Sequence, residues 1–137
     1  MSLKTKDAVV LSAEDVTPNM RRIVFGGPDL ANFPAGKEGG YLKLIFTGQP
    51  AYTADKPAMR TFSIRAHDAA ASELTIDMAL HGHTGAIACD WSKRAKRGDT
   101  IPIRWPPGMV KMAPPDADWY LIAADMTGLP AALCYVE

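Results

Sequence analysis

The sequence predicts a mainly β fold of about six antiparallel strands with one helix, followed by the start of an α/β domain. Three observations carry this prediction. Strand-like runs separated by turn signals fill most of residues 7–105. Ile87, Trp91 and Ala95 repeat every four residues between the last two runs, which is typical of a helix. A continuous apolar run at 119–124 then indicates a strand buried on both faces, as in parallel sheets.

The first two strands are expected at 7–14 and 20–27, where they flank a turn at Pro18 and Asn19 and pair antiparallel. The fifth has a clean period of two, with Leu74, Ile76, Met78 and Leu80 on one face and Glu73, Thr75, Asp77, Ala79 and His81 on the other. The remaining strands are expected at 41–48, 60–67 and 98–105.

The helix is predicted over 84–98, with Thr84 as N-cap and Gly98 as C-cap. Basic residues crowd its last turns. A nucleic-acid patch and a solvated helix end both explain them, and the second is favoured because cations suit a helix C-terminus. These residues are Lys93, Arg94, Lys96 and Arg97.

A proline-rich connection near Pro114 and Pro115 predicts a boundary between a domain at 1–115 and a second segment at 116–137. In that segment the apolar run is followed by a helix that begins near Leu129. A parallel strand needs neighbours reached by crossovers of a dozen or more residues. We therefore expect this segment to be the incomplete beginning of an α/β nucleotide-binding domain.

Composition narrows the class of protein. Of 137 residues, 47% are hydrophobic and 22% are charged, as in soluble globular domains. Lys and Arg total 15, as do Asp and Glu, so no overall field favours nucleic acid, and no apolar run has the length of a membrane helix. Cys89 and Cys134 are far apart and predict two free buried thiols in a reducing cytoplasm.

The segment Arg-Thr-Phe-Ser-Ile-Arg at 60–65 resembles the Arg-x-Tyr-Ser/Thr motif of the ferredoxin-reductase-like flavoproteins. Together with residues 16–30, 76–103 and 116–133, it resembles the siderophore-interacting protein family, cytoplasmic FAD-dependent ferric-siderophore reductases. The four segments occur in the family's order. The resemblance implies a six-stranded antiparallel Greek-key barrel that binds FAD.

Strict alternation places Arg60, Phe62 and Ile64 on one face of the fourth strand, and Thr61 and Ser63 on the other. An ordinary barrel strand with Phe62 and Ile64 in the core is the simplest interpretation of these residues alone. The resemblance implies instead that Arg60 binds the FAD pyrophosphate, Phe62 stacks near the flavin, and Ser63 bonds near flavin N5, with Thr61 beside them. Because Ser63 lies on the face opposite Phe62, its contact with the flavin requires either a backbone group or a strand edge at which residues of both faces reach the cofactor. Phe62 replaces the commoner Tyr, so a phenolic hydrogen bond is lost.

Two further stretches complete the FAD site that the resemblance implies. In the fifth strand, the stretch from Asp77 to His81, which includes Ala79, runs along FAD, mostly through backbone groups, with His81 closest to the phosphate end. His81 and His83 lack cysteine or acidic partners nearby and make a poor metal site.

At the helix start, Gly85 and Ala86 let a phosphate approach, and Ile87, Ala88 and Cys89 offer backbone donors. Ala88 stands where the family has serine, which removes one phosphate contact. In the last stretch, Asp125, Thr127, Leu129 and Pro130 match the family pattern, whereas Ala124, Met126 and Gly128 do not. That loop faces the nicotinamide and flavin in the family.

The implied function is an FAD-dependent oxidoreductase that passes electrons from NAD(P)H or ferredoxin through FAD to a ferric siderophore and releases ferrous iron. No side chain is expected to act as general acid or base. A non-catalytic FAD-binding module and a flavin reductase with another acceptor are the alternatives. We expect neither nucleic acid nor a membrane as a partner. Self-association of the chain through the second segment is expected as a possibility.

Overall fold

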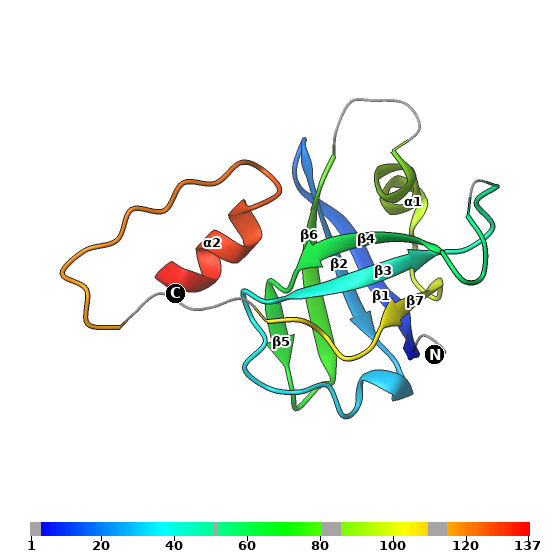
Figure 1. Cartoon of the computed structure of the whole chain (residues 1–137), viewed down its shortest axis with the longest axis horizontal. Coiled ribbons are helices and arrows are strands. Elements are labelled where there is room, and N and C mark those ends of the chain that lie inside the picture. Colours follow the sequence, from blue (N-terminus) through cyan, green and yellow to red (C-terminus); the bar gives the residue numbers. More distant parts are fainter. Residues whose placement is uncertain (1–3, 51, 81–85, 110–114) are drawn as a thin grey trace.

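The computed structural model describes residues 4–50, 52–80, 86–109 and 115–137. Within them the chain forms a strongly curved antiparallel sheet with two α-helices beside it (Figure 1). The strands are β1 (Thr5–Thr17), β2 (Met20–Gly26), β3 (Tyr41–Phe46), β4 (Ala58–Ser63), β5 (Ala66–Asp68), β6 (Glu73–Ala79) and β7 (Thr100–Arg104). The helices are a 3₁₀ turn at Pro28–Leu30, α1 (Ile87–Arg94) and α2 (Leu129–Val136).

The sheet order is β4-β3-β7-β1-β2-β6-β5, with every neighbouring pair antiparallel. The predicted mainly β class and its six antiparallel strands are confirmed, and the fourth predicted strand divides into β4 and β5. Between them, the N–H of Ile64 donates to the carbonyl oxygen of Gly40 beside β3, while the N–H of Arg65 donates to that of Thr75 in β6. Two opposite ends of the sheet are therefore joined by consecutive residues, which closes it into a barrel.

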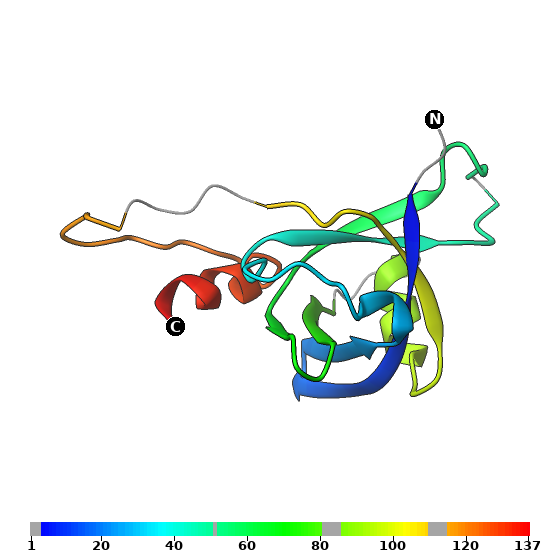
Figure 2. The same cartoon turned by 90° about the horizontal axis from the view of Figure 1, so that it is seen from below.

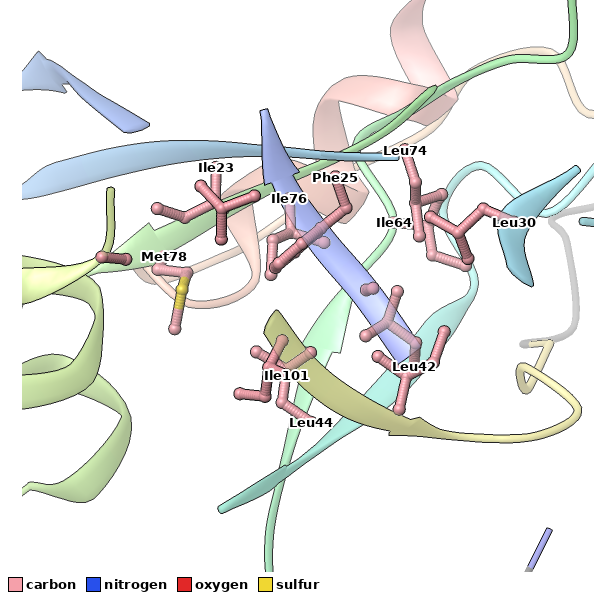
Figure 3. Packing of buried hydrophobic residues seen from close by; sticks show 14 of the residues in the cluster. Ile23, Phe25, Leu30, Leu42, Leu44, Ile64, Leu74, Ile76, Met78 and Ile101 are labelled. Atoms are coloured by element: carbon pink, nitrogen blue, oxygen red, sulfur yellow. The ribbon is translucent and has the colours of Figure 1, made fainter. Parts of the chain in front are cut away.

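The core fills the space enclosed by the curved sheet (Figure 3). The inward face of β6 follows the predicted period of two, and Leu74, Ile76 and Met78 are fully buried. They meet Phe25 from β2 and Leu44 from β3 in one hydrophobic cluster. This packing fixes which residues of β4 and β6 remain outside the core and are available to line a site.

Helix α1 is shorter than the predicted 84–98, and Thr84 lies outside the described residues. The predicted C-cap is wrong. Ala95 already leaves the helical conformation, and Gly98, with φ of 93°, forms the turn into β7. The predicted apolar face is confirmed, since Ala95 is buried and Ile87 and Trp91 pack against the core. The basic side chains at its end are exposed, as expected for a solvated helix terminus.

The predicted strand at 119–124 is wrong, because no strand is present between β7 and α2 among the described residues. Trp119 and Leu121 are 76% and 84% exposed. A strand buried on both faces needs parallel neighbours, and these residues have none here. The segment extends away from the barrel and returns to α2, which begins at Leu129 as predicted (Figures 1 and 2).

Helix α2 lies against the junction between β4 and β5. The Cys134 thiol donates to the carbonyl oxygen of Arg65 at 3.3 Å, and the Arg65 guanidinium forms a two-bond ion pair with the Glu137 carboxylate. Neither cysteine forms a disulfide among the described residues, as predicted, but only Cys89 is buried, whereas Cys134 is partly exposed. Within the described ranges, no helix is long and apolar enough to cross a membrane.

Candidate functional site

A cavity of about 350 Å³ opens between the outer edge of β4, the end of β6 and the first turn of α1. Its volume lies at the lower end of the range for small-molecule sites, roughly 300–1,000 Å³. It gathers every sequence-predicted site residue that the structure describes, namely Arg60, Thr61, Phe62, Ser63, Asp77, Ala79, Ile87, Ala88 and Cys89. The other two predicted residues, His81 and Gly85, lie outside the described residues.

Strand β4 contributes residues from both of its faces. It pairs with β3 on one side and, within the part of the chain that the structure describes, has no ladder partner on the other, so the cavity reaches around its free edge. This accounts for Phe62 and Ser63 lining one cavity despite strict alternation. Phe62 is half-buried against the core, whereas Arg60 is exposed rather than inward-facing.

Arg60 presents a charged group at the rim of the cavity. Within the described part of the chain, its guanidinium donates only to the carbonyl oxygen of the adjacent Met59, at 2.9 Å. Most of its five N–H donors therefore remain available to a ligand, and a guanidinium matches phosphate geometry.

The first turn of α1 supplies backbone donors. Its N-cap, Ala86, has no side-chain cap hydrogen bond, and its carbonyl oxygen accepts the first helical bond from the N–H of Asp90. The N–H groups of Ile87 and Ala88 precede that bond and so have no acceptor within the helix. Together with the positive end of the helix dipole, they form a wall suited to an anion.

Asp77 is the acidic residue of the cavity lining, and its side chain is only 6% exposed. Its two carboxylate oxygens accept hydrogen bonds from Nε and Nη2 of Arg22 at 2.7 and 2.8 Å. The hydrogen bond from Arg22 to Asp77 raises the pKa of the arginine, so the guanidinium remains charged. Sequence reasoning missed Arg22, because only the register of β2 against β6 places it opposite Asp77.

Four further residues line the cavity, namely Tyr41, Met78, Ala86 and Thr127. The family resemblance already implied Ala86 beside a phosphate and Met78 within the stretch along FAD, whereas Tyr41 and Thr127 were not assigned to the FAD site. Thr127 comes from the loop that precedes α2, where the Asp125 carboxylate accepts from the backbone N–H of Thr127 and of Gly128 at 3.0 and 2.9 Å. Its position in the family-like loop was a usable signal. Tyr41 had none, because its place depends on the pairing of β3 with β4.

The donor set argues for an organic anion rather than a metal. Within the described ranges there is no group of three or more His, Cys, Asp or Glu side chains able to hold a metal ion. Arginine, backbone N–H groups and a half-buried aromatic ring instead match a ligand that combines phosphate with a flat ring system. The residues present therefore fit FAD.

The fold and this cavity define a ferredoxin-reductase-like FAD-binding barrel. A ferredoxin NADP⁺ reductase from Neisseria gonorrhoeae with bound FAD and NADP has a similar fold, with a TM-score of 0.58 over 78% of this chain and 19% identity. The family described as "Siderophore-interacting FAD-binding domain" matches residues 9–55 and 49–110. The chain belongs to this family.

Two solved structures and two curated proteins show the same relationship. The siderophore-interacting protein SipS from Aeromonas hydrophila has a TM-score of 0.78 at 34% identity, and covers 97% of this chain and 53% of its own. A siderophore utilization protein from T. fusca has a TM-score of 0.79 at 29% identity, over 96% and 55%.

Ferric vibriobactin reductase ViuB of Vibrio cholerae is 28% identical over 89% of this chain and 49% of its own length. An NADPH-dependent ferric-chelate reductase of Escherichia coli is 27% identical over 94% and 55%. The chain thus spans about half the length of the curated relatives it matches.

Proposed function

We propose that this chain is the FAD-binding part of a reductase that delivers electrons to ferric iron held by a siderophore. The observation that carries the proposal is the cavity itself, which gathers an arginine, an aromatic ring and a helix N-terminus from three separate segments. Ferric vibriobactin and ferric-chelate reductases are the named activities of two relatives, which supports the substrate class.

Each wall of the cavity has a distinct task in this proposal. Arg60 and the backbone N–H groups of Ile87 and Ala88 bind the pyrophosphate, as charge-assisted donors. Phe62 packs against the isoalloxazine ring, and Ser63 provides a polar contact close to it. Thr61, Ala79 and Cys89 shape the remaining wall. His81 and Gly85 are proposed as further FAD contacts, and both lie outside the described residues.

FAD, when bound, supplies the redox chemistry, accepting electrons in pairs and passing them singly to iron. The chain's own residues bind and orient the cofactor, and none is required to move a proton. Ferrous iron binds oxygen-rich chelators less tightly than ferric iron, so reduction releases the metal. NAD(P)H is the proposed donor, with ferredoxin as the alternative.

The proposed architecture assigns residues 1–115 to the barrel and 116–137 to the beginning of an NAD(P)-binding-like domain. Thr127 supports this arrangement, since it brings the loop before α2 to the cavity. A cytoplasmic location and self-association through the exposed second segment complete the proposal. Leu121 and its exposed apolar neighbours support the latter.

A second function is favoured by one observation. Among the described residues, the apolar segment at 119–124 has no strand partners, so no binding site for an NAD(P)H electron donor is assembled on it there. In that case the chain alone is an FAD-binding module that holds the cofactor without accepting electrons from NAD(P)H.

Titration with FAD tests the proposal, followed by anaerobic addition of NADH or NADPH. We expect saturable binding, measured by quenching of flavin fluorescence. Bleaching of the flavin absorbance would favour the reductase, and persistent yellow colour would favour the module. A chain that binds no FAD contradicts both.

The variant Arg60→Ala tests the assignment within the cavity. Loss of a charged hydrogen bond costs about 1.5–3 kcal/mol, so FAD affinity should fall on the order of tenfold to a hundredfold. Arg97→Ala is the matched control, because Arg97 is exposed in the turn between α1 and β7 and does not line the cavity. Equal FAD affinity in Arg60→Ala and the parent would exclude the pyrophosphate role.

A further inference from the structure

The cavity proposed to bind FAD has a carboxylate in its wall. Asp77 lies in β6 between Met78 and the core residue Ile76, and its side chain is nearly excluded from solvent. FAD brings the negative charges of its pyrophosphate, and reduction adds further negative charge to the ring. A bare carboxylate in the same poorly solvated space would repel both.

Arg22 removes this conflict. It is the direct cross-strand partner of Asp77, with β2 and β6 paired in antiparallel register. Its guanidinium engages the two carboxylate oxygens side by side, at 2.7 and 2.8 Å. A two-bond pair of this kind fixes orientation as well as charge, so Asp77 cannot swing toward a ligand.

The surroundings of Arg22 make Asp77 its dominant partner. On the other side of β2, Glu14 of β1 is its register partner, and it acts on Arg22 through charge at a distance, as does Glu137. Among the described contacts only Asp77 is hydrogen-bonded to the Arg22 side chain. Arg22 is 34% exposed, whereas Asp77 is 6% exposed, so the arginine reaches inward from the surface to the buried acid.

We propose that Arg22 is a positioning residue of the cofactor cavity, which holds the Asp77 carboxylate in the wall and compensates its charge so that an anionic flavin cofactor can bind. This inference rests on the proposed function. It adds a residue outside the cavity lining to the determinants of FAD affinity and flavin potential.

The proposal predicts opposite effects for the two partners. Arg22→Gln leaves a buried, uncompensated carboxylate, so FAD affinity should fall on the order of tenfold or more, and the flavin midpoint potential should shift to a lower value. Asp77→Asn leaves an uncompensated cation beside the cavity, so FAD affinity should rise and the midpoint potential should shift upward. The double variant Arg22→Gln with Asp77→Asn should return both quantities close to those of the parent.

The experiment measures the FAD dissociation constant by flavin fluorescence and the midpoint potential by anaerobic spectroelectrochemistry, for the parent, both single variants, the double variant and Arg97→Gln. Arg97→Gln controls for the loss of one positive charge elsewhere on the molecule. A merely structural ion pair would lower the melting temperature of Arg22→Gln but leave affinity and potential of the folded protein unchanged. That result would overturn the proposal.

The remaining outcomes are equally decisive. Should Arg22→Gln fail to fold, Asp77→Asn alone decides, because unchanged affinity and potential in that variant also overturn the proposal. A double variant as impaired as Arg22→Gln would show that charge compensation is not the cause. A parent chain that binds no FAD refutes both the proposed function and this inference. If the parent binds FAD, the proposed FAD site stands, and the variants then test the role of Arg22 alone.

Discussion

The ring of Tyr41 lies directly over Gly108. A Cβ atom added to Gly108 would lie 2.1 Å from Cζ of Tyr41, and the three heavy atoms nearest to it all belong to that ring. The two residues also exchange backbone hydrogen bonds, at 3.1 and 2.7 Å. Tyr41 lines the FAD cavity on one side and, on the other, a groove formed with Lys43, Arg104 and Trp105. The small size of Gly108 therefore determines the position of the Tyr41 ring, which lines both the cavity and the groove.

We expect Gly108→Ala to displace the Tyr41 ring, because no Cβ fits at this distance. Overpacking of this kind costs about 1–3 kcal/mol of folding stability. The displaced ring should also change FAD affinity, since it forms part of the cavity. Urea denaturation and FAD titration measure the two effects. In a Tyr41→Ala background the added methyl group should cost little, and an undiminished cost there would place the clash elsewhere.

The sequence predicts the barrel well because its signals are local. The period of two in β6 and the turn at Pro18 and Asn19 need no information from distant residues. The division of the fourth strand at Ile64 was not visible, because it depends on a change of partner from β3 to β6. The wrong prediction of a strand at 119–124 has a related cause. An apolar run indicates that a segment favours burial, but it does not show whether neighbouring strands are present to bury it.

The candidate site was predictable wherever a residue type and a family-like motif coincide, as at Arg60 and Phe62. Arg22 and Tyr41 carry no such motif. They enter the site only through strand register, which pairs Arg22 with Asp77 and Tyr41 with Ser63. Register depends on packing of the whole sheet, so a single sequence does not reveal it.

Arg21 is expected to fix the orientation of α1. Its Nε donates to the carbonyl oxygen of Ser92 at 2.8 Å, and Nη1 pairs with Asp15 at the same distance. Ser92 belongs to the last turn of α1, where carbonyl groups lack partners within the helix. Arg21→Met should destabilise the fold by about 1–2 kcal/mol and weaken FAD binding, because the helix N-terminus then loses its fixed direction.

Urea denaturation with FAD titration on the same samples measures both consequences. Asp15→Asn is the control, since it removes only the negative charge beside Arg21. Asp15 is 58% exposed, so this loss should cost less than about 1 kcal/mol. If Asp15→Asn and Arg21→Met have equal effects, the bond to the Ser92 carbonyl does not position α1.

The docking of α2 is expected to depend on pH through Glu137. The hydrogen bond from Arg65 lowers the pKa of the Glu137 carboxyl, and the same bond raises the pKa of Arg65. A carboxyl with a lowered pKa in the docked state stabilises docking above its ordinary pKa. This contribution is lost as the pH falls through the lowered value. The raised pKa of Arg65 keeps the arginine charged throughout, so the loss occurs only on the acid side.

Hydrogen exchange of the α2 amides, followed from neutral to acid pH, measures this loss. Protection of residues 129–136 should fall in the acid range while the barrel strands stay protected. Glu137→Gln should show weaker protection at neutral pH and no such acid transition, whereas Asp55→Asn, in the exposed loop between β3 and β4, should keep it. The Cys134 thiol still donates to the Arg65 carbonyl at low pH, so α2 loosens rather than detaches fully. An α2 whose protection does not change with pH in the parent chain would show that the ion pair contributes nothing to docking.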